Sequence, residues 1–345
     1  MSFDLASFGS LFSIPQKNGL TRPKKVRGSG LPMVNMGELF AHPRIGNIQM
    51  DLVPFSDSQA SFLLEKNDLL FARQSLVLSG AGQCSIFVGD GIATTFESHL
   101  IRCRLKKSVS NPLFYFYYFR SPIGRTAMET IVEQGAGASG IRGSDLVKLQ
   151  VPLLPKYLQD EVAVVLGSLD DRISLLRETN ATLEAIAQTL FKSWFVDFDP
   201  VHSKQQGHEP EGMDSETAAL FPDSFEESEL GLVPKGWHGG TLGQIADTVR
   251  SQRQPSELNS DTNYVGLEHI PRRCLSLANW GSAEKLESAK SCFSKGDILF
   301  GKLRPYFHKV VIAPFAGVCS TDILVCQPKL PEYYGIVTML SLIHI

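Results

Sequence analysis

The sequence predicts an α/β (α+β) protein in which two repeated domains are joined by one long helix. Two observations carry this prediction: short segments recur in the same order about 230 residues apart, and an apolar heptad pattern runs between the two copies. A chain of 345 residues is long enough for two or three domains. We expect a first domain over 1–155, a helix over 156–196, a linker over 197–232 and a second domain over 233–345.

The repeat is clearest where Glu65–Arg73 matches Ser294–Lys302. In both copies a Lys-(Asn/Gly)-Asp turn leads into an apolar run, and a basic residue follows it. Gly and Pro break the surrounding apolar runs into short segments, which is typical of strands. Two further matches keep the same order: Leu31–Met36 with Asn263–Leu267, and Gly91–Thr95 with Gly317–Thr321.

The long helix is predicted from an apolar stripe in which spacings of four and three residues alternate. From Leu158 to Phe195 such a helix is about 57 Å long at about 1.5 Å per residue. It is apolar on one side only, so we expect a partner to cover the stripe, although packing on its own domain is the alternative. A polar Asn in such a seam fixes register at some cost in stability. The stripe consists of Val162, Leu166, Leu169, Ile173, Leu176, Asn180, Leu183, Ala187, Leu190 and Trp194.

Charge is segregated along the chain although the net charge is only −3. Residues 197–231 hold ten Asp or Glu and a single Lys, which leaves 32 basic against 26 acidic residues elsewhere. The acidic segment also contains several Gly and Pro residues, and we expect it to be a solvated linker without regular structure. The basic remainder is compatible with contacts to nucleic-acid phosphates.

Other sequence features favour a cytoplasmic protein. No apolar run is long enough for a membrane span, and Asp4 stands where a signal peptide carries a basic residue. The six cysteines form no C-x-x-C pair and have no zinc-site spacing, so we expect reduced thiols and no metal. We also expect no cofactor. Asn111–Met128 fits a helix, with Asn111 as its N-cap and Pro112 in its first position.

Together these parts resemble the specificity subunits of type I restriction-modification enzymes. The motifs that carry the resemblance flank the helix: Val151–Ile173, Leu190–Pro200, Leu220–Phe225 and Gly231–Trp237. The resemblance covers roughly residues 5 to 335. Members of this family continue into a second spacer helix, so the resemblance indicates an incomplete second domain and a C-terminally truncated chain. Ser341–Ile345 match nothing in the first half.

The resemblance implies a non-catalytic protein whose two target-recognition domains each bind one half of a bipartite target in double-stranded DNA. It implies that the stripe on the helix is the interface for methyltransferase subunits and, through them, for the restriction subunit. Without such a partner we expect the chain to pair with a second copy through this stripe.

Candidate DNA-binding residues follow the repeated strand in each domain. Arg73 and Gln74 leave it in the first domain, and Arg pairs with guanine and Gln with adenine in the major groove. Lys302, Arg304 and Tyr306 leave it in the second domain. Ordinary surface charge is the alternative for each of them. A basic run suited to phosphate contacts consists of Arg22, Lys24, Lys25 and Arg27.

Two sequence patterns suggest enzymatic chemistry and are set aside. Gly135–Gly140 satisfies G-x-G-x-x-G, but no helix follows it directly, so we expect a flexible loop near DNA or the partner subunit. Asn111–Phe114 resembles the N-P-P-(Y/F) motif of adenine methyltransferases without its second Pro. The rival functions are a stand-alone DNA methyltransferase and a coiled-coil interaction protein with no role on DNA.

Overall fold

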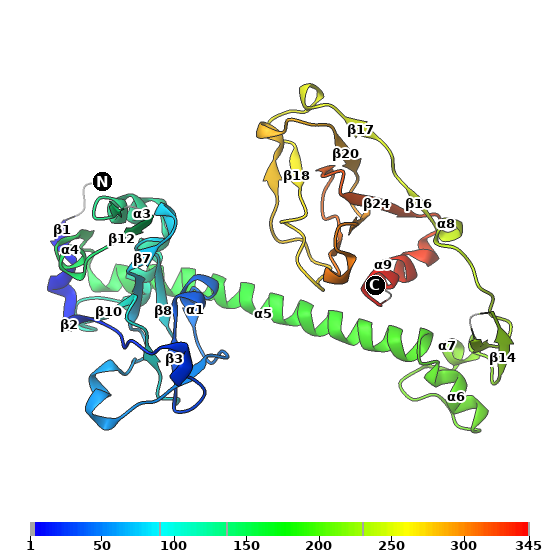
Figure 1. Cartoon of the computed structure of the whole chain (residues 1–345), viewed down its shortest axis with the longest axis horizontal. Helices are drawn as coiled ribbons and strands as arrows, with labels where there is room; N and C mark the ends of the chain where they lie inside the picture. The colour runs from blue at the N-terminus through cyan, green and yellow to red at the C-terminus, as the bar shows by residue number, and fades with distance from the viewer. Residues whose placement is uncertain (1–3, 90, 136, 230, 344–345) are drawn as a thin grey trace. The chain divides into compact units, whose positions relative to one another are not determined.

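The computed structural model describes residues 4–343 except 90, 136 and 230 (Figure 1). It divides into two compact units, Met1–Ser174 and Leu175–Ile345. Helix α5 (Lys156–Phe195) begins in the first unit and ends in the second. Strands and helices alternate with turns in both units, as expected of a mixed α/β chain.

A five-stranded sheet in the order β2-β10-β6-β8-β4 forms the centre of the first unit. All four residues of the middle strand β6 are buried, which explains its unbroken apolar run. An aromatic cluster that includes Phe8, Phe71 and Phe119 fills the core beside it. The strands are β2 (Phe12–Asn18), β4 (Arg44–Ile45), β6 (Leu69–Ala72), β8 (Cys84–Phe87) and β10 (Leu100–Leu105).

The helix predicted over Asn111–Met128 is two helices, because Ser121 and Pro122 start a new one. The Asn111 side chain accepts a hydrogen bond from the Leu113 amide at 2.9 Å and caps α2 (Pro112–Arg120). Ser121 caps α3 (Pro122–Glu129) by accepting from the Gly124 amide. The remaining helices of this domain are α1 (Met36–Ala41) and α4 (Gly143–Lys148).

Three smaller sheets complete the first domain. In one of them, β3 (Leu31–Val34) pairs with both β5 (Asp51–Val53) and β9 (Thr95–Phe96). Another pairs β1 (Leu5–Ser7) with β13 (Gln150–Pro152). The last, in the order β11-β12-β7, is built from β7 (Gln74–Ser75), β11 (Glu133–Gly135) and β12 (Ala138–Gly140).

The second unit carries two larger sheets, in the orders β16-β24-β21-β22 and β17-β20-β23-β18-β19. Helix α9 (Tyr334–Ile343) packs against β21 and β22, and α8 is Leu242–Ile245. The first sheet comprises β16 (Ala246–Thr248), β21 (Ile298–Gly301), β22 (Val310–Ile312) and β24 (Ile323–Pro328). The second comprises β17 (Gln252–Arg253), β18 (Asn263–Val265), β19 (Gly281–Ser282), β20 (Lys290–Phe293) and β23 (Gly317–Cys319).

The two domains repeat the same strand plan. The order β2-β10-β6-β8 in the first corresponds to β16-β24-β21-β22 in the second. A parallel pair recurs as well, because β3 pairs with β9 and β18 pairs with β23. The prediction of two repeated α/β domains is therefore confirmed.

The third sequence match is three residues out of register. Val34 pairs with Phe96, and its equivalent Val265 pairs with Cys319, so Phe96 corresponds to Cys319. Gly317 is thus equivalent to Thr94 rather than to Gly91. The sequence match aligned Gly317 with Gly91 because both are glycines, but Gly91 lies in the turn before the strand. The pairing of the strands gives the correct register.

The acidic segment has regular structure, so the prediction of an unstructured linker is wrong. It contains α6 (Asp199–Gln205), α7 (Ser215–Ala219), β14 (Phe225–Ser228) and β15 (Gly231–Pro234). Aromatic residues near its two ends cluster: the Phe195 ring stacks on Trp237 with centroids 6.0 Å apart, and Phe221 contacts both. Contacts among these rings, with Phe221 buried and Trp237 half-buried, offset the unfavourable composition of the segment between them.

Helix α5 meets the first domain through a face of small residues that the sequence analysis did not single out. Ala163 and Gly167 are buried, and a Cβ on Gly167 would lie 3.3 Å from a Leu113 methyl carbon. Gln159 is completely buried and its amide nitrogen donates to the Leu154 carbonyl at 2.7 Å. Tyr117 donates a 2.7 Å hydrogen bond to Asp170. This second contact joins the domain to α5 eleven residues after Gln159.

None of the described helices combines the length and apolar character that crossing a membrane requires. The C-terminal residues Ser341 to Ile343 continue helix α9, which follows β24 as α2 follows β10. His344 and Ile345 of the tail that matches nothing in the first half lie outside the described residues.

Candidate nucleic-acid interface

Arg73 and Gln74 lie where the central strand β6 leaves the first domain's sheet. Gln74 opens β7, which pairs with β12 so that Gln74 faces Gly140 and Ser75 faces Ser139. The Arg73 carbonyl accepts a 2.9 Å hydrogen bond from the Ile141 amide. The backbone is fixed, yet within the described residues neither the Arg73 nor the Gln74 side chain has a hydrogen-bond partner.

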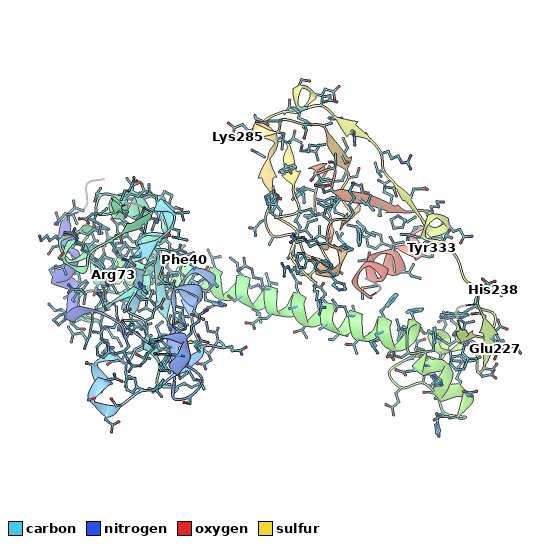
Figure 2. The ribbon with its side chains drawn as sticks, viewed as in Figure 1. Phe40, Arg73, Glu227, His238, Lys285 and Tyr333 are labelled. Atoms are coloured by element: carbon cyan, nitrogen blue, oxygen red, sulfur yellow. The ribbon has the colours of Figure 1, made fainter. Side chains whose placement is uncertain are left out.

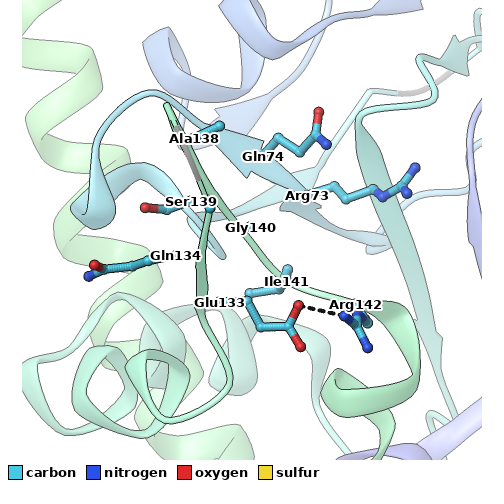
Figure 3. Close-up of a pocket in the computed structure, with 10 residues that line it drawn as sticks. Arg73, Gln74, Glu133, Gln134, Ala138, Ser139, Gly140, Ile141 and Arg142 are labelled. Carbon is cyan, nitrogen blue, oxygen red and sulfur yellow. Dashed lines mark ion pairs between the residues drawn. The ribbon is translucent and has the colours of Figure 1, made fainter.

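The described residues of the G-x-G-x-x-G segment lie in two paired strands and the turn residue Gly137 between them, so the expected loop is part of a hairpin. Glu133–Gly135 and Ala138–Gly140 pair as antiparallel strands; Ala136 lies outside the described residues. The hairpin and β7 border a hollow of about 260 Å³ that Arg73, Gln74 and Arg142 help to line. In Figure 3 the Glu133 carboxylate turns toward Arg142, with which it forms a 2.8 Å ion pair. This surface is open and polar, unlike a nucleotide cradle.

An apolar turn follows directly after β7. Leu76, Val77 and Leu78 are 89%, 61% and 43% exposed. The turn closes through the short 3-10 helix η4 (Leu78–Gly80), and Arg125 donates hydrogen bonds to the Ser79 and Ala81 carbonyls at 2.9 and 3.3 Å. The exposed apolar side chains therefore stand on a firmly held backbone.

The second domain presents Lys302, Arg304 and Tyr306 from the loop that follows β21, the equivalent of β6. All three side chains are exposed. Arg304 and His308 have φ angles of 51° and 49°, in the left-handed region that non-glycine residues rarely adopt. Such strain collects at functional sites, where surrounding contacts hold the backbone in place.

The same domain adds Arg272, which the sequence analysis did not select. Its guanidinium carbon lies 3.7 Å from the centroid of the Phe307 ring. The nearby Arg273 amide donates to the His308 carbonyl at 3.0 Å and closes the loop. The loop thus gathers exposed cationic and aromatic side chains. Figure 2 shows the side chains of the whole chain as sticks, with Arg73 of the first domain labelled.

The predicted phosphate-binding run divides into two kinds of residue. Arg22 donates to the Pro54 carbonyl and to Gln59, and Arg27 forms a 2.6 Å ion pair with Asp51. These arginines hold the loop together. Lys24 and Lys25 lie in the 3-10 helix η2 (Lys24–Val26), are exposed, and have no side-chain partner within the described residues. The two lysines are the members of the run that remain open to a ligand.

The turns before the equivalent strands β6 and β21 are built in the same way. Asp68 and Asp297 are buried, and each accepts a 2.8 Å hydrogen bond from the backbone amide three residues before it. In the first domain the Arg104 guanidinium donates two 2.7 Å hydrogen bonds to the Asp68 carboxylate, and these bonds raise the pKa of Arg104. In the second, Gln327 donates to Asp297 at 2.8 Å.

The predicted stripe on α5 is largely exposed. Val162, Leu169, Ile173, Leu176, Leu183 and Leu190 are between 37% and 58% exposed. Leu166 and Trp194 are half-buried, and Asn180 and Ala187 are exposed among them. An exposed row of apolar side chains of this length is compatible with an interaction surface.

Among the described residues no group of three or more His, Cys, Asp or Glu is arranged to hold a metal ion. Burial raises the pKa of the Cys84 and Cys103 thiols well above the usual value and that of Cys319 to about 12. These thiols are protonated at neutral pH and therefore poor nucleophiles and metal ligands.

Besides Arg272, the sequence analysis missed three features: the hairpin, the exposed apolar turn and the small-residue face of α5. The hairpin residues Gln134, Ser139 and Arg142 belong to the same surface as Gln74. A Gly-Ala-Gly turn between short runs was the available signal for a hairpin. In the sequence, Leu76–Leu78 looks like the continuation of an apolar strand, so it does not indicate an exposed turn. The only sign of the Ala163/Gly167 face is a pair of small residues four positions apart.

The fold defines a protein with two repeated domains. In each domain a segment that follows an equivalent strand, β6 or β21, carries cationic side chains, and a helix with one apolar stripe lies between the repeats in sequence. No family model matches the chain. It is 25% identical over 279 residues to the EcoDI type I restriction enzyme specificity subunit of Escherichia coli, covering 78% of this chain and 60% of the relative. It is 30% identical over 271 residues to the HindI specificity subunit of Haemophilus influenzae, covering 66% and 57%.

A solved S subunit of a type I restriction-modification system from M. genitalium is similar at 14% identity and a TM-score of 0.43, covering 99% of this chain and 78% of that one. The chain spans about 60% of the length of the curated relatives named above. The chain is similar to type I restriction enzyme specificity subunits, and the resemblance inferred from the sequence motifs is confirmed.

Proposed function

We propose that this chain recognises DNA sequence for a type I restriction-modification complex, with each domain contacting one half of a bipartite target in double-stranded DNA. One observation carries the proposal above the others. Equivalent strands β6 and β21 are followed by different side chains on the same scaffold: the half-buried Arg73 and the exposed Gln74 in one copy, and the exposed Lys302 in the other. One architecture with two sets of side chains suits two different half-sites.

Chemical catalysis belongs, in this proposal, to partner subunits. The apolar stripe of α5 supports docking of methyltransferase subunits, since exposed apolar side chains along several turns gain free energy when a protein covers them. Through these subunits the restriction subunit joins the complex. The helix then sets the distance between the half-sites.

The DNA contacts in this proposal fall into two groups. Arg73, Gln74 and Lys302 contact base edges, because they follow equivalent strands and their side chains have no hydrogen-bond partner within the described residues. Lys24 and Lys25 contact phosphates, which strengthens binding without selecting sequence. Arg22 and Arg27 position the loop that carries the lysines.

We expect two results from the purified chain, alone and with the methyltransferase subunits of its own system. DNA affinity falls as salt rises, and Lys24→Ala with Lys25→Ala lowers the slope of log K against log salt by about 1 to 2. The chain alone transfers no labelled methyl group from S-adenosylmethionine to DNA. Salt-independent binding, or methyl transfer by the chain alone above a protein-free control, contradicts the proposal.

A further inference from the structure

The most exposed large apolar side chain in the described part of the chain stands directly beside the proposed base-contacting residues. Leu76 is 89% exposed and is separated from Gln74 by one residue. Gln74, Ser75 and Leu76 all line a hollow of about 380 Å³.

The walls of this hollow are apolar where they meet Leu76. Met36, Phe40 and Ala138 line it together with His99. The amide of Gln74 is thus the polar edge of a hollow whose remaining wall is suited to aliphatic groups. This combination fits a ligand that offers hydrogen-bonding atoms and a methyl group side by side.

Leu76 is held in its exposed position by the turn beneath it. The Val77 amide donates to the Ser75 hydroxyl at 3.2 Å, and the Gly80 amide donates to the Val77 carbonyl at 3.1 Å. A Cβ on Gly80 would lie only 2.2 Å from that Ser75 hydroxyl oxygen, so the close turn requires glycine. With the backbone fixed, Leu76 stays exposed at a cost in free energy that a bound ligand recovers.

The second domain repeats the feature with other side chains. Leu303 directly follows Lys302, the equivalent of Arg73, and is 50% exposed. Tyr306, a few residues on, is 59% exposed. In sequence, Leu303 is equivalent to Gln74 rather than to Leu76, so the two copies share an exposed apolar group near the cationic residue but not its exact position.

We propose that Leu76 determines specificity by contacting the C5 methyl group of a thymine next to the adenine bound by Gln74. Thymine carries its methyl group in the major groove, where adenine presents the N6 and N7 atoms that pair with a Gln amide. Gln74 and Ala138 also line the neighbouring hollow, where Arg73 and Gln134 lie beside the Glu133–Arg142 ion pair, and these polar groups favour DNA over an apolar protein surface. The inference rests on the proposed function.

The test uses uracil, which lacks the methyl group and keeps every hydrogen-bonding atom of thymine. The chain with its methyltransferase subunits first enriches duplexes from a random-sequence pool. Each thymine of the enriched duplex is then replaced by uracil in turn. With the unaltered chain, one uracil lowers affinity about fourfold, the value of one buried methyl group.

The variants make the result specific to Leu76. Leu76→Ser binds the thymine duplex more weakly and no longer distinguishes it from the uracil duplex. Ile123→Ser, which removes another apolar side chain that is 75% exposed in the same domain, keeps the distinction. A uracil penalty that persists in Leu76→Ser overturns the proposal, as does a Leu76→Ser variant that only weakens methyltransferase association. An unaltered complex that enriches no sequence overturns the proposed function itself.

Discussion

Replacing Asp68 by Ala destabilises the first domain by about 3–5 kcal/mol. The Asp68 side chain is 1% exposed and neutralises Arg104, whose guanidinium it holds through two hydrogen bonds. Arg102, 3% exposed, lies close enough for Asp68 to offset part of the burial that lowers its pKa. Removing the carboxylate leaves the buried Arg102 without compensation and Arg104 with the exposed Glu65 as its remaining ion-pair partner, and such a change costs several kcal/mol.

Hydrogen exchange of the β6 and β10 amides in the full chain measures this effect locally. Glu65→Ala is the matched control, because Glu65 also pairs with Arg104 but is 66% exposed, and we expect a loss below about 1 kcal/mol. Asp297→Ala, which removes a carboxylate bonded to a neutral amide, should cost an intermediate amount of about 1–3 kcal/mol. If Asp68→Ala and Glu65→Ala reduced hydrogen-exchange protection equally, the buried Asp68–Arg104 pair would contribute no more to stability than the exposed Glu65–Arg104 pair.

Inserting seven residues of helical sequence after Asn180 widens the unread gap between the half-sites by about three base pairs. Seven residues keep the heptad phase and lengthen a helix by about 10 Å, which equals about three steps of 3.4 Å along DNA. Methylated sites mapped after assembly with the methyltransferase subunits report the gap.

The control insertion goes into the acidic segment. Seven residues added after Gly207, which has a φ of 77° in an exposed turn, leave the helix unchanged and should leave the gap unchanged. A gap that is constant in the helix variant, or that changes equally in both variants, is incompatible with the helix as the ruler.

The elements predicted best are those whose sequence pattern and physical cause coincide. The heptad spacing gave a helix over 158–195, and the structure has one over Lys156–Phe195. The Lys-(Asn/Gly)-Asp turn identified the repeat because a buried Asp must accept the same backbone hydrogen bond in both copies. Local rules of this kind survive divergence of the surrounding side chains.

Other features depend on contacts that no local pattern reports. The acidic segment folds because Phe195, Phe221 and Trp237 meet from distant positions in sequence. Gly135–Gly140 becomes a strand pair because β7 offers an edge, and that pairing is the reason the hairpin joins the surface around Gln74. Arg22 and Arg27 looked like free cations until their partners Gln59 and Asp51 were known.

The enriched sequences of two double variants test most directly whether each domain contacts its own half of the target. From a random-sequence pool, we expect the unaltered complex to enrich two half-sites separated by a fixed gap. Arg73→Ala with Gln74→Ala should relax one half-site, and Lys302→Ala with Tyr306→Ala should relax only the other. Each lost base contact costs about 1–3 kcal/mol. Relaxation of the same half-site by both variants, or of neither half-site by either, would contradict recognition by two equivalent domains.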